Sequence, residues 1–463
     1  MISADFCKTV SLAGATVSLD ALLAAREQRA ALQQQCIADF RLPVLSVTLL
    51  AVGAVKKNGL LDTIFAHCLQ ELTACFAKLG VTPRAEFIRP LTTGHEALFV
   101  LPIAADTLKQ AMMMLEARSP LSRLWDLDVF DEQGRLLSRS DFGGSPRRCL
   151  VCERDAKICA RERTHSTEAI LAEMQKRVLA ETIADLARQA LLDEVYLTPK
   201  PGLVDRRNNG SHRDMNVQTF ERSAEALRPY FADCVRIGLD RLDLPPLQLF
   251  ATIRPLGQQA EQAMWRATGG VNTHKGAIFA FGLVCTALGR LLGQGHYCAE
   301  NWLTQLCDGV AEMTKGVCRE LEMTAENQPL TAGMRLFRQF GLTGARGEAE
   351  KGFPLVRQAW TFWQNLPNID DEHRLRLTLL FLMAHNQDTN VVHRGGLAGL
   401  TFVQQQAQQI LADTQRQDKE TLIAKLTAFD TACIQRNLSS GGSADLLGLT
   451  WFFILLDRIL FTF

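Results

Sequence analysis

Apolar residues recur with two different periods along this chain, and each period prevails in its own part of the sequence. Between about residues 43 and 150, short apolar runs rich in β-branched residues alternate with segments of helical spacing. The runs at residues 45–55 and 97–103 predict strands, and the segments at residues 59–79 and 104–117 predict helices. Strands that alternate with helices are typical of an α/β or an α+β domain.

After about residue 167 only the helical period remains. Apolar residues then recur every three or four positions, beginning with Phe220, Ala224 and Leu227, and this spacing continues to the C-terminus. The change falls inside a predicted amphipathic helix at residues 166–196. We therefore expect two domains, a mixed α/β domain over residues 1–177 and an all-α helical domain over residues 178–463.

The composition is that of an ordinary folded protein. Hydrophobic residues make up 47% of the 463 residues and charged residues 22%, which excludes a largely disordered chain. The 50 basic and 50 acidic residues cancel, so the sequence gives no electrostatic reason to expect binding to nucleic acid or to a membrane. The 13 cysteines are odd in number and spread along the chain, which is typical of a reduced, cytoplasmic protein.

Neither end of the chain has the pattern of an exported or membrane-spanning protein. Asp5, Lys8 and Asp20 interrupt the apolar stretch that an export signal needs. The apolar tail, residues 446–463, is interrupted by charges and is shorter than the ~20 apolar residues that cross a bilayer. We expect a cytoplasmic protein with no membrane partner, whose tail forms a buried terminal helix.

One short segment of the first domain carries two carboxylates in a strand pattern. Three apolar residues from Trp125 to Val129 alternate with Asp126 and Asp128, so a strand would place the two acids on one face, ~6.5 Å apart. Two carboxylates at that spacing, together with phosphate oxygens and water, are ligands that Mg²⁺ prefers. The alternative is a pair of solvated acids on an edge strand.

A second candidate metal site follows in a charged stretch of the same domain. Cys149 and Cys152 form a Cys-x-x-Cys pair, and Cys159 and His165 add a third thiol and an imidazole. These are the soft ligands of a structural Zn²⁺ site, although their spacing differs from that of the standard zinc fingers. Two alternatives stay open: reduced core cysteines, or a segment whose arginines between residues 147 and 163 bind phosphates or an acidic partner.

These motifs resemble the holo-acyl-carrier-protein synthase family of citrate lyase over about residues 1–175. The resemblance rests on residues 120–129, Ser138 with Arg139, and residues 148–152, 159–161 and 165–166. Members of this family attach a phosphoribosyl-dephospho-CoA group to a serine of the carrier subunit. The resemblance implies a nucleotidyltransferase-like α+β fold, with Asp126 and Asp128 as the metal-binding pair and Arg123 as a phosphate contact. Arg148, in the arginine-rich stretch, is a second candidate phosphate contact.

Four polar segments interrupt the apolar spacing of the helical half. The first, residues 198–215, is a long irregular loop with two prolines, two glycines and a cluster of polar side chains. Long polar loops on a rigid scaffold commonly carry function, and the alternative is a plain capped turn. Its candidate site residues are Lys200, Asp205, Asn209, His212 and Asp214.

The other three segments, residues 269–276, 385–396 and 437–445, each stand where an apolar helix begins. Asn272 or Thr273 would cap the first of these helices, and Ser443 the last. The free N–H groups of a helix start attract anions, so three such starts predict a multi-phosphate ligand, with carboxylates nearby for Mg²⁺. Taken singly, each is an ordinary helix start. The candidate residues are His274, Lys275, Asp388, His393, Arg394, Gly395, Gly396, Gly441, Gly442, Ser443 and Asp445.

These four segments, in this order, resemble the triphosphoribosyl-dephospho-CoA synthase family from about residue 178 to the C-terminus. The resemblance implies that this domain joins the ribose C1 of ATP to the 2′-hydroxyl of 3′-dephospho-CoA, releases adenine and retains the triphosphate. Lys275 and Arg394 would hold the triphosphate, with Mg²⁺ between it and the acids. One carboxylate would stabilise the positive charge that develops on the ribose, while a second group deprotonates the hydroxyl. The candidates for these roles are Asp205, Asp214, Asp388 and Asp445.

The two resemblances support each other, because the product of the second domain is the substrate of the first. We therefore expect a bifunctional transferase that makes the prosthetic group of citrate lyase. It would transfer this group to a serine of the acyl carrier protein (gamma) subunit with release of pyrophosphate. Two alternatives stay open: the same chemistry for the carrier subunit of malonate decarboxylase, and a non-catalytic adaptor that binds zinc through its Cys/His segment and a partner through its helical half.

Overall fold

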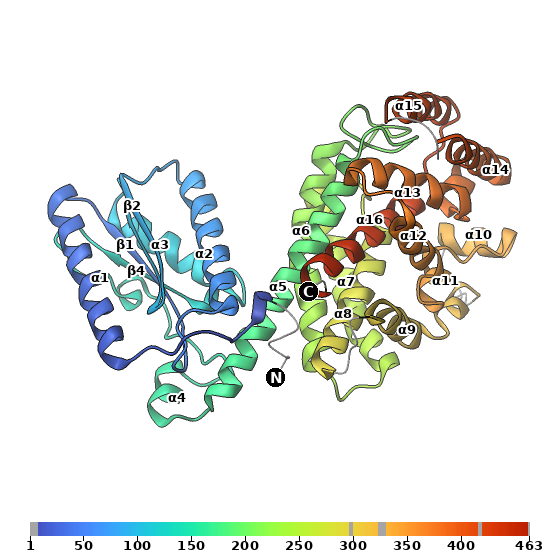
Figure 1. Ribbon diagram of the computed structural model, residues 1–463. Helices are drawn as coiled ribbons and strands as arrows, with labels where there is room; N and C mark the ends of the chain where they lie inside the picture. The colour runs from blue at the N-terminus through green and yellow to red at the C-terminus, as the bar shows by residue number, and fades with distance from the viewer. Residues whose placement is uncertain (1–7, 296–299, 323–329, 415–418, 462–463) are drawn as a thin grey trace. The chain divides into compact units, whose positions relative to one another are not determined.

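The computed structural model describes residues 8–295, 300–322, 330–414 and 419–461. The chain divides into two compact units, Met1–Glu181 (unit 1) and Thr182–Phe463 (unit 2). The division falls inside the helix α5 (Thr167–Tyr196) (Figure 1). The two-domain organisation that the change of period predicts is confirmed.

Unit 1 is built on a four-stranded sheet with the order β2-β3-β1-β4, in which every neighbouring pair is antiparallel. Its strands are β1 (Val44–Leu49), β2 (Ala85–Leu91), β3 (Gly94–Val100) and β4 (Trp125–Phe130). Sequence reasoning predicted β1, β3 and β4 and missed β2. That strand lies at an edge, includes Pro90 and exposes every second side chain, so it lacks a continuous apolar run.

Helices cover both faces of this sheet (Figure 1). Cys36 of the first helix packs against Leu98 on one face, and Phe76 of the second meets the ring of Phe99 edge-on at 5.4 Å on the other. The helices of unit 1 before α5 are α1 (Leu19–Phe40), α2 (Gly59–Lys78), α3 (Ala105–Glu116) and α4 (Ala156–Glu162), with the 3₁₀ segments η1 (Lys8–Val10), η2 (Ser122–Leu124) and η3 (Arg139–Phe142).

Local capping signals begin the two long helices of unit 1. The Ser18 hydroxyl accepts the N–H of Ala21 at the start of α1, and the Asn58 side chain accepts the N–H of Leu61 at the start of α2. Sequence reasoning predicted α2 but not α1. Cys36 is the one fully buried side chain of α1, so this helix has almost no apolar stripe that could reveal it.

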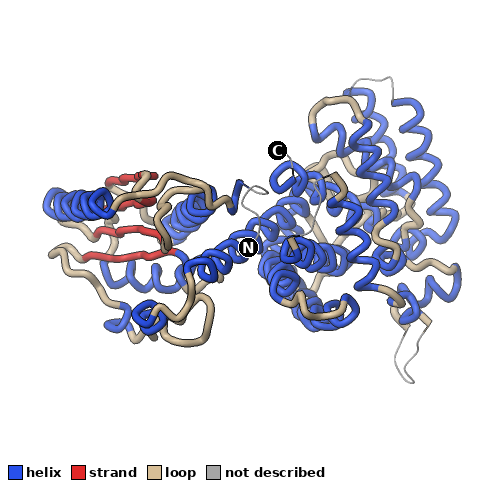
Figure 2. The backbone as a smooth tube through the Cα atoms, turned by 60° about the horizontal axis from the view of Figure 1, so that its bottom comes forward, coloured by secondary structure: helices blue, strands red, loops and turns tan. Residues whose placement is uncertain are grey.

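Unit 2 is helical in the part of the chain that the structure describes, and no strand occurs among those residues (Figure 2). After α5, its helices are α6 (Val217–Asp240), α7 (Pro246–Thr268), α8 (Lys275–Gln294), α9 (Trp302–Thr314), η4 (Val317–Leu321), α10 (Ala332–Phe340), α11 (Gly344–Glu350), α12 (Pro354–Asn365), α13 (Asp371–His385), α14 (Thr389–Thr414), α15 (Lys419–Gln435), α16 (Gly441–Leu456) and the π-helical turn η5 (Asp457–Phe461).

The core of unit 2 is centred on its two most apolar helices, α8 and α16. Phe281 of α8 stacks on Phe452 of α16 with centroids 5.3 Å apart. Glycines allow α6 and α8 to approach closely, since a Cβ on Gly289 would lie 2.2 Å from the carbonyl oxygen of Val235. Both central helices begin at polar segments, so packing of their apolar bodies fixes where those polar starts lie.

Among the described helices, α8 is long and apolar enough to cross a membrane by length and composition, and 78% of its most apolar window is buried inside the protein. This is the buried position expected of a core helix. Residues 446–456 of the apolar tail lie in α16, which is buried as the sequence predicts, whereas residues 457–461 form η5, where Arg458 and Ile459 are exposed. Residues 462–463 of that tail lie outside the described residues.

Candidate active sites

Strand β4 carries the predicted carboxylate pair. Side chains at alternate positions from Trp125 are buried, whereas Asp126 is exposed and Asp128 half-buried, so the predicted alternation is confirmed. In the sheet, Asp126 lies opposite Thr48 and Asp128 opposite Ser46 of β1. The two acids therefore share one face of an edge strand, the arrangement that a shared cation needs.

Burial and mutual repulsion both act on this carboxylate pair. The pKa of Asp128 is raised, first by burial and then by the negative charge of Asp126. A divalent cation between the two carboxylates would relieve this repulsion, and carboxylate oxygens are the ligands that Mg²⁺ prefers. The donor set of this pair therefore fits Mg²⁺.

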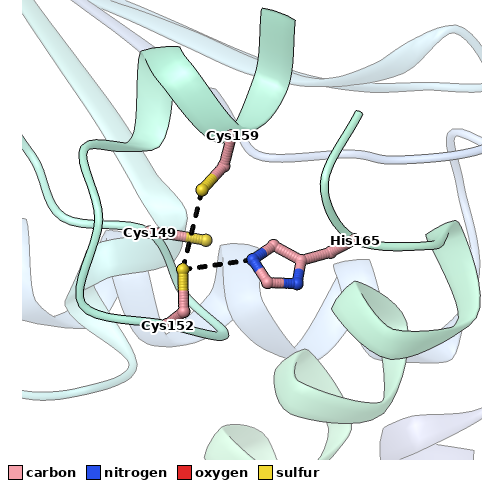
Figure 3. A group of neighbouring side chains, drawn as sticks. All are labelled: Cys149, Cys152, Cys159 and His165. Carbon is pink, nitrogen blue, oxygen red and sulfur yellow. Dashed lines mark hydrogen bonds between the residues drawn. The ribbon is translucent and has the colours of Figure 1, made fainter. Parts of the chain in front are cut away.

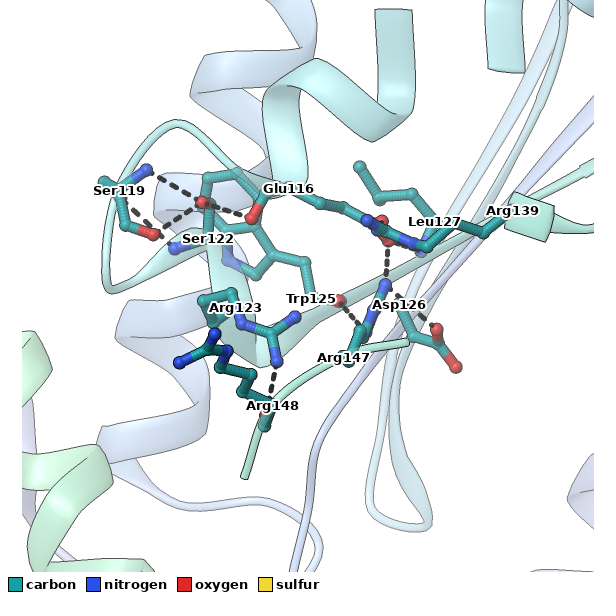
Figure 4. Close-up of polar contacts among 10 residues, drawn as sticks. All are labelled: Glu116, Ser119, Ser122, Arg123, Trp125, Asp126, Leu127, Arg139, Arg147 and Arg148. Atoms are coloured by element: carbon teal, nitrogen blue, oxygen red, sulfur yellow. Dashed lines mark hydrogen bonds and ion pairs between the residues drawn. The ribbon is translucent and has the colours of Figure 1, made fainter. Parts of the chain in front are cut away.

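A buried glutamate holds two arginines beside the pair (Figure 4). Glu116, at the end of α3, is 3% exposed, and its carboxylate oxygens contact the guanidinium groups of Arg139 and Arg147. The same carboxylate accepts the backbone N–H of Leu127 at 3.0 Å, which ties it to the edge of β4. Arg147 also lies 3.5 Å from an oxygen of Asp126. Glu116 thus positions positive charge next to the carboxylate pair.

Sequence reasoning missed Glu116 but found the neighbourhood of its partners. A glutamate at the end of a helix is normally exposed, and nothing in the local pattern marks this one as buried. Arg139 and Arg147, in contrast, stand in the motif and in the arginine-rich stretch that the sequence singles out.

The two predicted phosphate contacts in unit 1 differ in their surroundings. Arg123 donates to the carbonyl oxygen of Arg148 at 2.7 Å, and its pKa is lowered, first by burial and then by the charge of Arg147. Cations that crowd one another in this way favour a bound anion. The side chain of Arg148 contacts Glu153 instead, and both side chains are exposed.

A small basic cavity opens on the same face of the sheet as the carboxylate pair. Its volume is about 140 Å³, and the side chains that line it include Arg26, Arg29, Lys56 and Thr48, together with Glu96, which forms an ion pair with Arg29 at 3.1 Å. Because Thr48 lies opposite Asp126, the cavity begins one strand away from the pair. Sequence reasoning missed these cations, since two of them come from the unpredicted helix α1.

The four predicted soft ligands converge in unit 1 (Figure 3). One ligand atom from each of Cys149, Cys152, Cys159 and His165 lies within 4.8 Å of all the others. The Sγ of Cys152 is 3.6 Å from the Sγ of Cys159 and 3.2 Å from Nε2 of His165. This cluster can hold a metal ion.

In unit 2, all four polar segments meet at one cavity of about 170 Å³. Its wall also includes parts of α5 and α6. The predicted residues in the wall are Lys200, His212, His274, Lys275, Arg394, Gly441 and Asp445.

Two carboxylates face this cavity. Asp445 of α16 lies against the start of α8, where a Cβ on Gly276 would be 2.0 Å from its Oδ2. Burial, and then the charges of Glu194 and Asp388, raise the pKa of Asp445 well above its usual range. Glu194 of α5 forms a buried ion pair with Lys200, with Oε1 2.5 Å from Nζ. Burial raises the pKa of Glu194, while Lys200 opposes that rise.

Sequence reasoning missed Glu194 as a site residue. It lies in a long amphipathic helix with many other charged residues, and only the loop that returns Lys200 to its side reveals its position.

Asp388 accepts hydrogen bonds from backbone N–H groups of the segments that form the cavity wall. It accepts the N–H of Asn390 at 2.9 Å and that of Ser443 at 2.7 Å, so one carboxylate caps both α14 and α16. Ser443, which sequence reasoning predicts as the cap of α16, lies inside that helix and donates its hydroxyl to Asp388. An acid distant in the sequence therefore replaces the local cap. At α8, the side chain of Asn272 accepts the N–H of Lys275 at 3.3 Å.

Asp205 has a similar structural role inside the 198–215 loop. Its carboxylate accepts the N–H groups of Lys200 at 2.9 Å, Arg207 at 2.7 Å and Asn208 at 3.0 Å. These bonds hold the loop so that Lys200 reaches Glu194.

The two predicted phosphate cations of unit 2 lie at the cavity with partners of their own. Arg394 donates to the carbonyl oxygen of Ser211 at 2.8 Å and lies 3.2 Å from Nδ1 of His212. The Lys275 ammonium is 2.9 Å from Glu261, and its side chain is 54% exposed.

The remaining predicted residues are not part of the cavity wall. Asn209, Asp214 and His393 are exposed. Gly396 breaks α14 with a φ of 63°, and a Cβ on Gly395 would lie 2.4 Å from Leu438. A Cβ on Gly442 would lie 3.0 Å from the Asp388 carboxylate, so this glycine lets the shared cap form.

The two histidines of the cavity, the buried His274 and the half-buried His212, have lowered pKa values. Burial, and then Lys200, lower the pKa of His274 to about 3, and burial, then Arg394, lower that of His212 to about 4. His274 contacts the Ser223 hydroxyl through Nδ1 at 2.7 Å, while its buried Nε2 has no hydrogen-bond partner among the described residues. At neutral pH the His274 ring can hydrogen-bond a substrate through Nε2 without adding charge, whereas both ring nitrogens of His212 already contact Ser439 and Arg394.

Acid should destabilise unit 2 through His274. Because its pKa lies below that of an unfolded histidine, the unfolded chain binds the extra proton, so stability falls as the pH drops from about 6.5 toward 3. In this pH window His274 makes the free energy of unfolding depend on pH by up to about 1.4 kcal/mol per pH unit. We expect His274→Gln to remove this dependence. Urea unfolding followed by tryptophan fluorescence at several pH values measures it, since Trp125 is the one tryptophan outside unit 2. Equal slopes for the variant and the wild type would contradict the burial of a neutral imidazole.

Comparison with known proteins identifies relatives of both units. Residues 17–181 match the family model of apo-citrate lyase phosphoribosyl-dephospho-CoA transferase, and residues 180–460 match that of ATP:dephospho-CoA triphosphoribosyl transferase. "Protein CitXG" of Haemophilus influenzae is 53% identical over 97% of this chain and 98% of its own length. A 2-(5''-triphosphoribosyl)-3'-dephosphocoenzyme-A synthase of Haemophilus ducreyi is 51% identical over 66% of this chain and 98% of its own length. A synthase of the same name from Pectobacterium atrosepticum is 47% identical over 62% of this chain and 92% of its own length.

Proposed function

Because the chain belongs to the apo-citrate lyase phosphoribosyl-dephospho-CoA transferase family in unit 1 and to the ATP:dephospho-CoA triphosphoribosyl transferase family in unit 2, we propose that it catalyses both reactions in sequence. The protein is a transferase of citrate lyase prosthetic group synthesis, which excludes a non-catalytic adaptor. The family name of unit 1 favours the carrier of citrate lyase over that of malonate decarboxylase.

Unit 2 would join ATP to 3′-dephospho-CoA in its cavity. A bond forms between the 2′-oxygen of dephospho-CoA and C1 of the ATP ribose, the bond from C1 to adenine breaks, and adenine leaves with a proton. Asp445 would accept the hydroxyl proton, because its carboxylate lines the cavity and lies against the start of α8. Glu194, held beside Lys200, would stabilise the positive charge on the ribose.

The triphosphate would lie between Arg394 and the start of α8. Arg394 is held at the cavity by Ser211, and Lys275 stands beside the free N–H groups of α8. The unpartnered Nε2 of His274 adds a hydrogen-bonding group in the same wall. Mg²⁺ bound to the triphosphate would lower its charge, and the acids of the cavity offer ligands to it.

Unit 1 would transfer the product to the carrier. The hydroxyl oxygen of the carrier serine attacks the phosphorus next to the ribose, the bond from that phosphorus to pyrophosphate breaks, and the hydroxyl proton passes to a base. Asp126 and Asp128 would hold Mg²⁺, which stabilises the charge of the departing pyrophosphate. Arg123 and the basic cavity beside Thr48 would bind the phosphates. The acidic pair on a strand supports the nucleotidyltransferase-like interpretation of this unit.

The observation that carries the proposal is the convergence of four separate polar segments on one cavity of unit 2. Its wall combines the cations that a triphosphate needs with the carboxylates that a glycosyl transfer needs. We propose that the protein acts in the reducing cytoplasm, which the free thiol of every described cysteine supports.

The protein incubated with ATP, Mg²⁺ and 3′-dephospho-CoA should release adenine and form a new CoA-like product. Adenine should appear only when dephospho-CoA is present, because its 2′-hydroxyl is the acceptor. Chromatography resolves both products, and mass spectrometry of added apo carrier subunit then detects the attached group. A folded protein that releases no adenine would refute the proposal for unit 2. Modification of a malonate decarboxylase carrier in preference to the citrate lyase carrier would refute the choice of partner.

A further inference from the structure

We propose that Cys149, Cys152, Cys159 and His165 bind a structural Zn²⁺ that holds the arginine-bearing segment of unit 1 at the carboxylate pair of β4. Three thiols and one imidazole form a ligand set of structural zinc sites. Such soft ligands exclude Mg²⁺ and Ca²⁺, which prefer oxygen.

Two distances between ligand atoms of the cluster are close to those around a tetrahedral zinc ion, and all four ligand atoms lie within 4.8 Å of one another. Zn–S bonds of about 2.3 Å and Zn–N bonds of about 2.0–2.1 Å separate two sulfurs by about 3.8 Å, and a sulfur from a nitrogen by about 3.6 Å. The Sγ atoms of Cys152 and Cys159 are 3.6 Å apart, and Nε2 of His165 is 3.2 Å from the Sγ of Cys152 (Figure 3). All three cysteines are free thiols, so no disulfide competes for them.

The backbone presents the ligands to a common point. The N–H of Cys149 donates to the carbonyl oxygen of Arg154 at 2.8 Å, and the N–H of Ala156 donates to the carbonyl oxygen of Arg147 at 2.9 Å. These two bonds close a turn around the Cys-x-x-Cys pair. Cys159 lies on the helix α4 that follows this turn. His165 stands between α4 and α5 (Figure 3).

This segment has almost no hydrophobic core of its own. Between residues 143 and 166, Cys159 is the one buried side chain, and the apolar Val151 and Ile158 are exposed. A segment that buries so little apolar surface needs another constraint to keep one conformation. A bound metal supplies it, because ligand binding and folding of such segments are coupled.

The cluster is joined directly to the arginines of the candidate transfer site. Arg147, two residues before Cys149, contacts Glu116 and lies 3.5 Å from Asp126. The carbonyl oxygen of Arg148 accepts Arg123 at 2.7 Å. Loss of zinc would therefore release Arg147, and the Arg148 carbonyl oxygen that accepts a hydrogen bond from Arg123, from their positions. This consequence for catalysis rests on the proposed function of unit 1, whereas zinc binding does not.

Metal analysis of the full chain tests the site itself. Protein without an affinity tag, purified with a thiol reductant and without chelator, should contain about one zinc ion per chain. Cys152→Ser should retain less than about a tenth of that amount. Cys75→Ser is the matched control, since Cys75 is a half-buried thiol of unit 1 outside the cluster. If Cys152→Ser does not fold, Co²⁺ exchanged into the wild type should give the visible absorption of a tetrahedral, thiolate-bound ion.

The two activities of one chain test the role of the zinc. Transfer to the carrier, supplied with preformed triphosphoribosyl-dephospho-CoA, should fall at least about tenfold in Cys152→Ser, while adenine release by unit 2 stays at the wild-type rate. Wild-type protein that neither holds zinc nor accepts Co²⁺, or equal zinc in Cys152→Ser and the control, would overturn the site. If Cys152→Ser loses its zinc but transfers the prosthetic group at the wild-type rate, the positioning role of the zinc is overturned. Zinc that is present in a protein with no transferase activity would refute the proposed function and leave the site standing.

Discussion

Asp128→Asn should greatly slow transfer of the prosthetic group to the carrier and leave adenine release unchanged. Asp128 is the half-buried member of the carboxylate pair, and its pKa is raised by burial and by Asp126, so it gains most from a bound cation. Asparagine keeps the shape but removes the charge that holds Mg²⁺. The expected loss is roughly 10²- to 10³-fold in the transfer rate, the scale seen when one preorganised charge-stabilising group is removed.

Mass spectrometry of the carrier measures this loss, with preformed triphosphoribosyl-dephospho-CoA as the donor. Glu86→Gln is a suitable control, because Glu86 is an exposed acid on β2, the strand at the opposite edge of the same sheet. Adenine release from ATP and dephospho-CoA reports on unit 2 in the same sample. Loss of both activities in a folded Asp128→Asn protein would contradict separate sites, and full transfer activity would exclude Asp128 from the metal-binding pair.

Asp445→Asn should have the opposite effect, with adenine release lost and transfer retained when the preformed donor is supplied. Asp445 lines the cavity of unit 2 and lies against Gly276, and it is the proposed acceptor of the hydroxyl proton. Removal of a general base typically lowers the rate by roughly 10²- to 10⁴-fold. Chromatography of free adenine measures it.

The stability of Asp445→Asn separates a catalytic role from a structural one. Burial, and then the charges of Glu194 and Asp388, raise the pKa of Asp445, so its carboxylate is both desolvated and repelled in the folded protein. Asparagine removes the repulsion, and the melting temperature should stay the same or rise while activity falls. Asp308→Asn, at an exposed acid on α9, is the control for a generic loss of charge. A lower melting temperature with wild-type adenine release would assign Asp445 to the fold instead.

The fold was predictable wherever the local pattern determines the structure. The alternation from Trp125 predicted β4 and the shared face of its two acids, and the fully apolar segment after Lys275 predicted the buried helix α8. The pattern failed for α1 and for β2. Helix α1 is mostly exposed and β2 exposes every second side chain, so both leave little apolar signal in the sequence.

The candidate sites were predictable as segments and less so as single residues. The polar loop at residues 198–215 and the three helix starts do meet at one cavity. Within the loop, however, Asp205 binds backbone N–H groups. In the 385–396 segment, Asp388 likewise caps two helices. An aspartate that faces a substrate and one that caps a helix have the same appearance in a sequence.

By itself, the sequence determined the two-domain division, the carboxylate pair on one strand face, the Cys/His ligand set and the polar segments that form the cavity of unit 2. These follow from periodicity, ligand chemistry and local breaks in apolar spacing, all of which act over a few residues. Only the tertiary structure decided that Glu116 holds Arg147 beside Asp126, and that Glu194 stands beside Lys200 in the wall that Asp445 shares. These pairings depend on tertiary packing, which places distant segments next to one another. The groups that packing brings beside a buried carboxylate determine whether it is held in place, repelled, or shifted to a higher pKa.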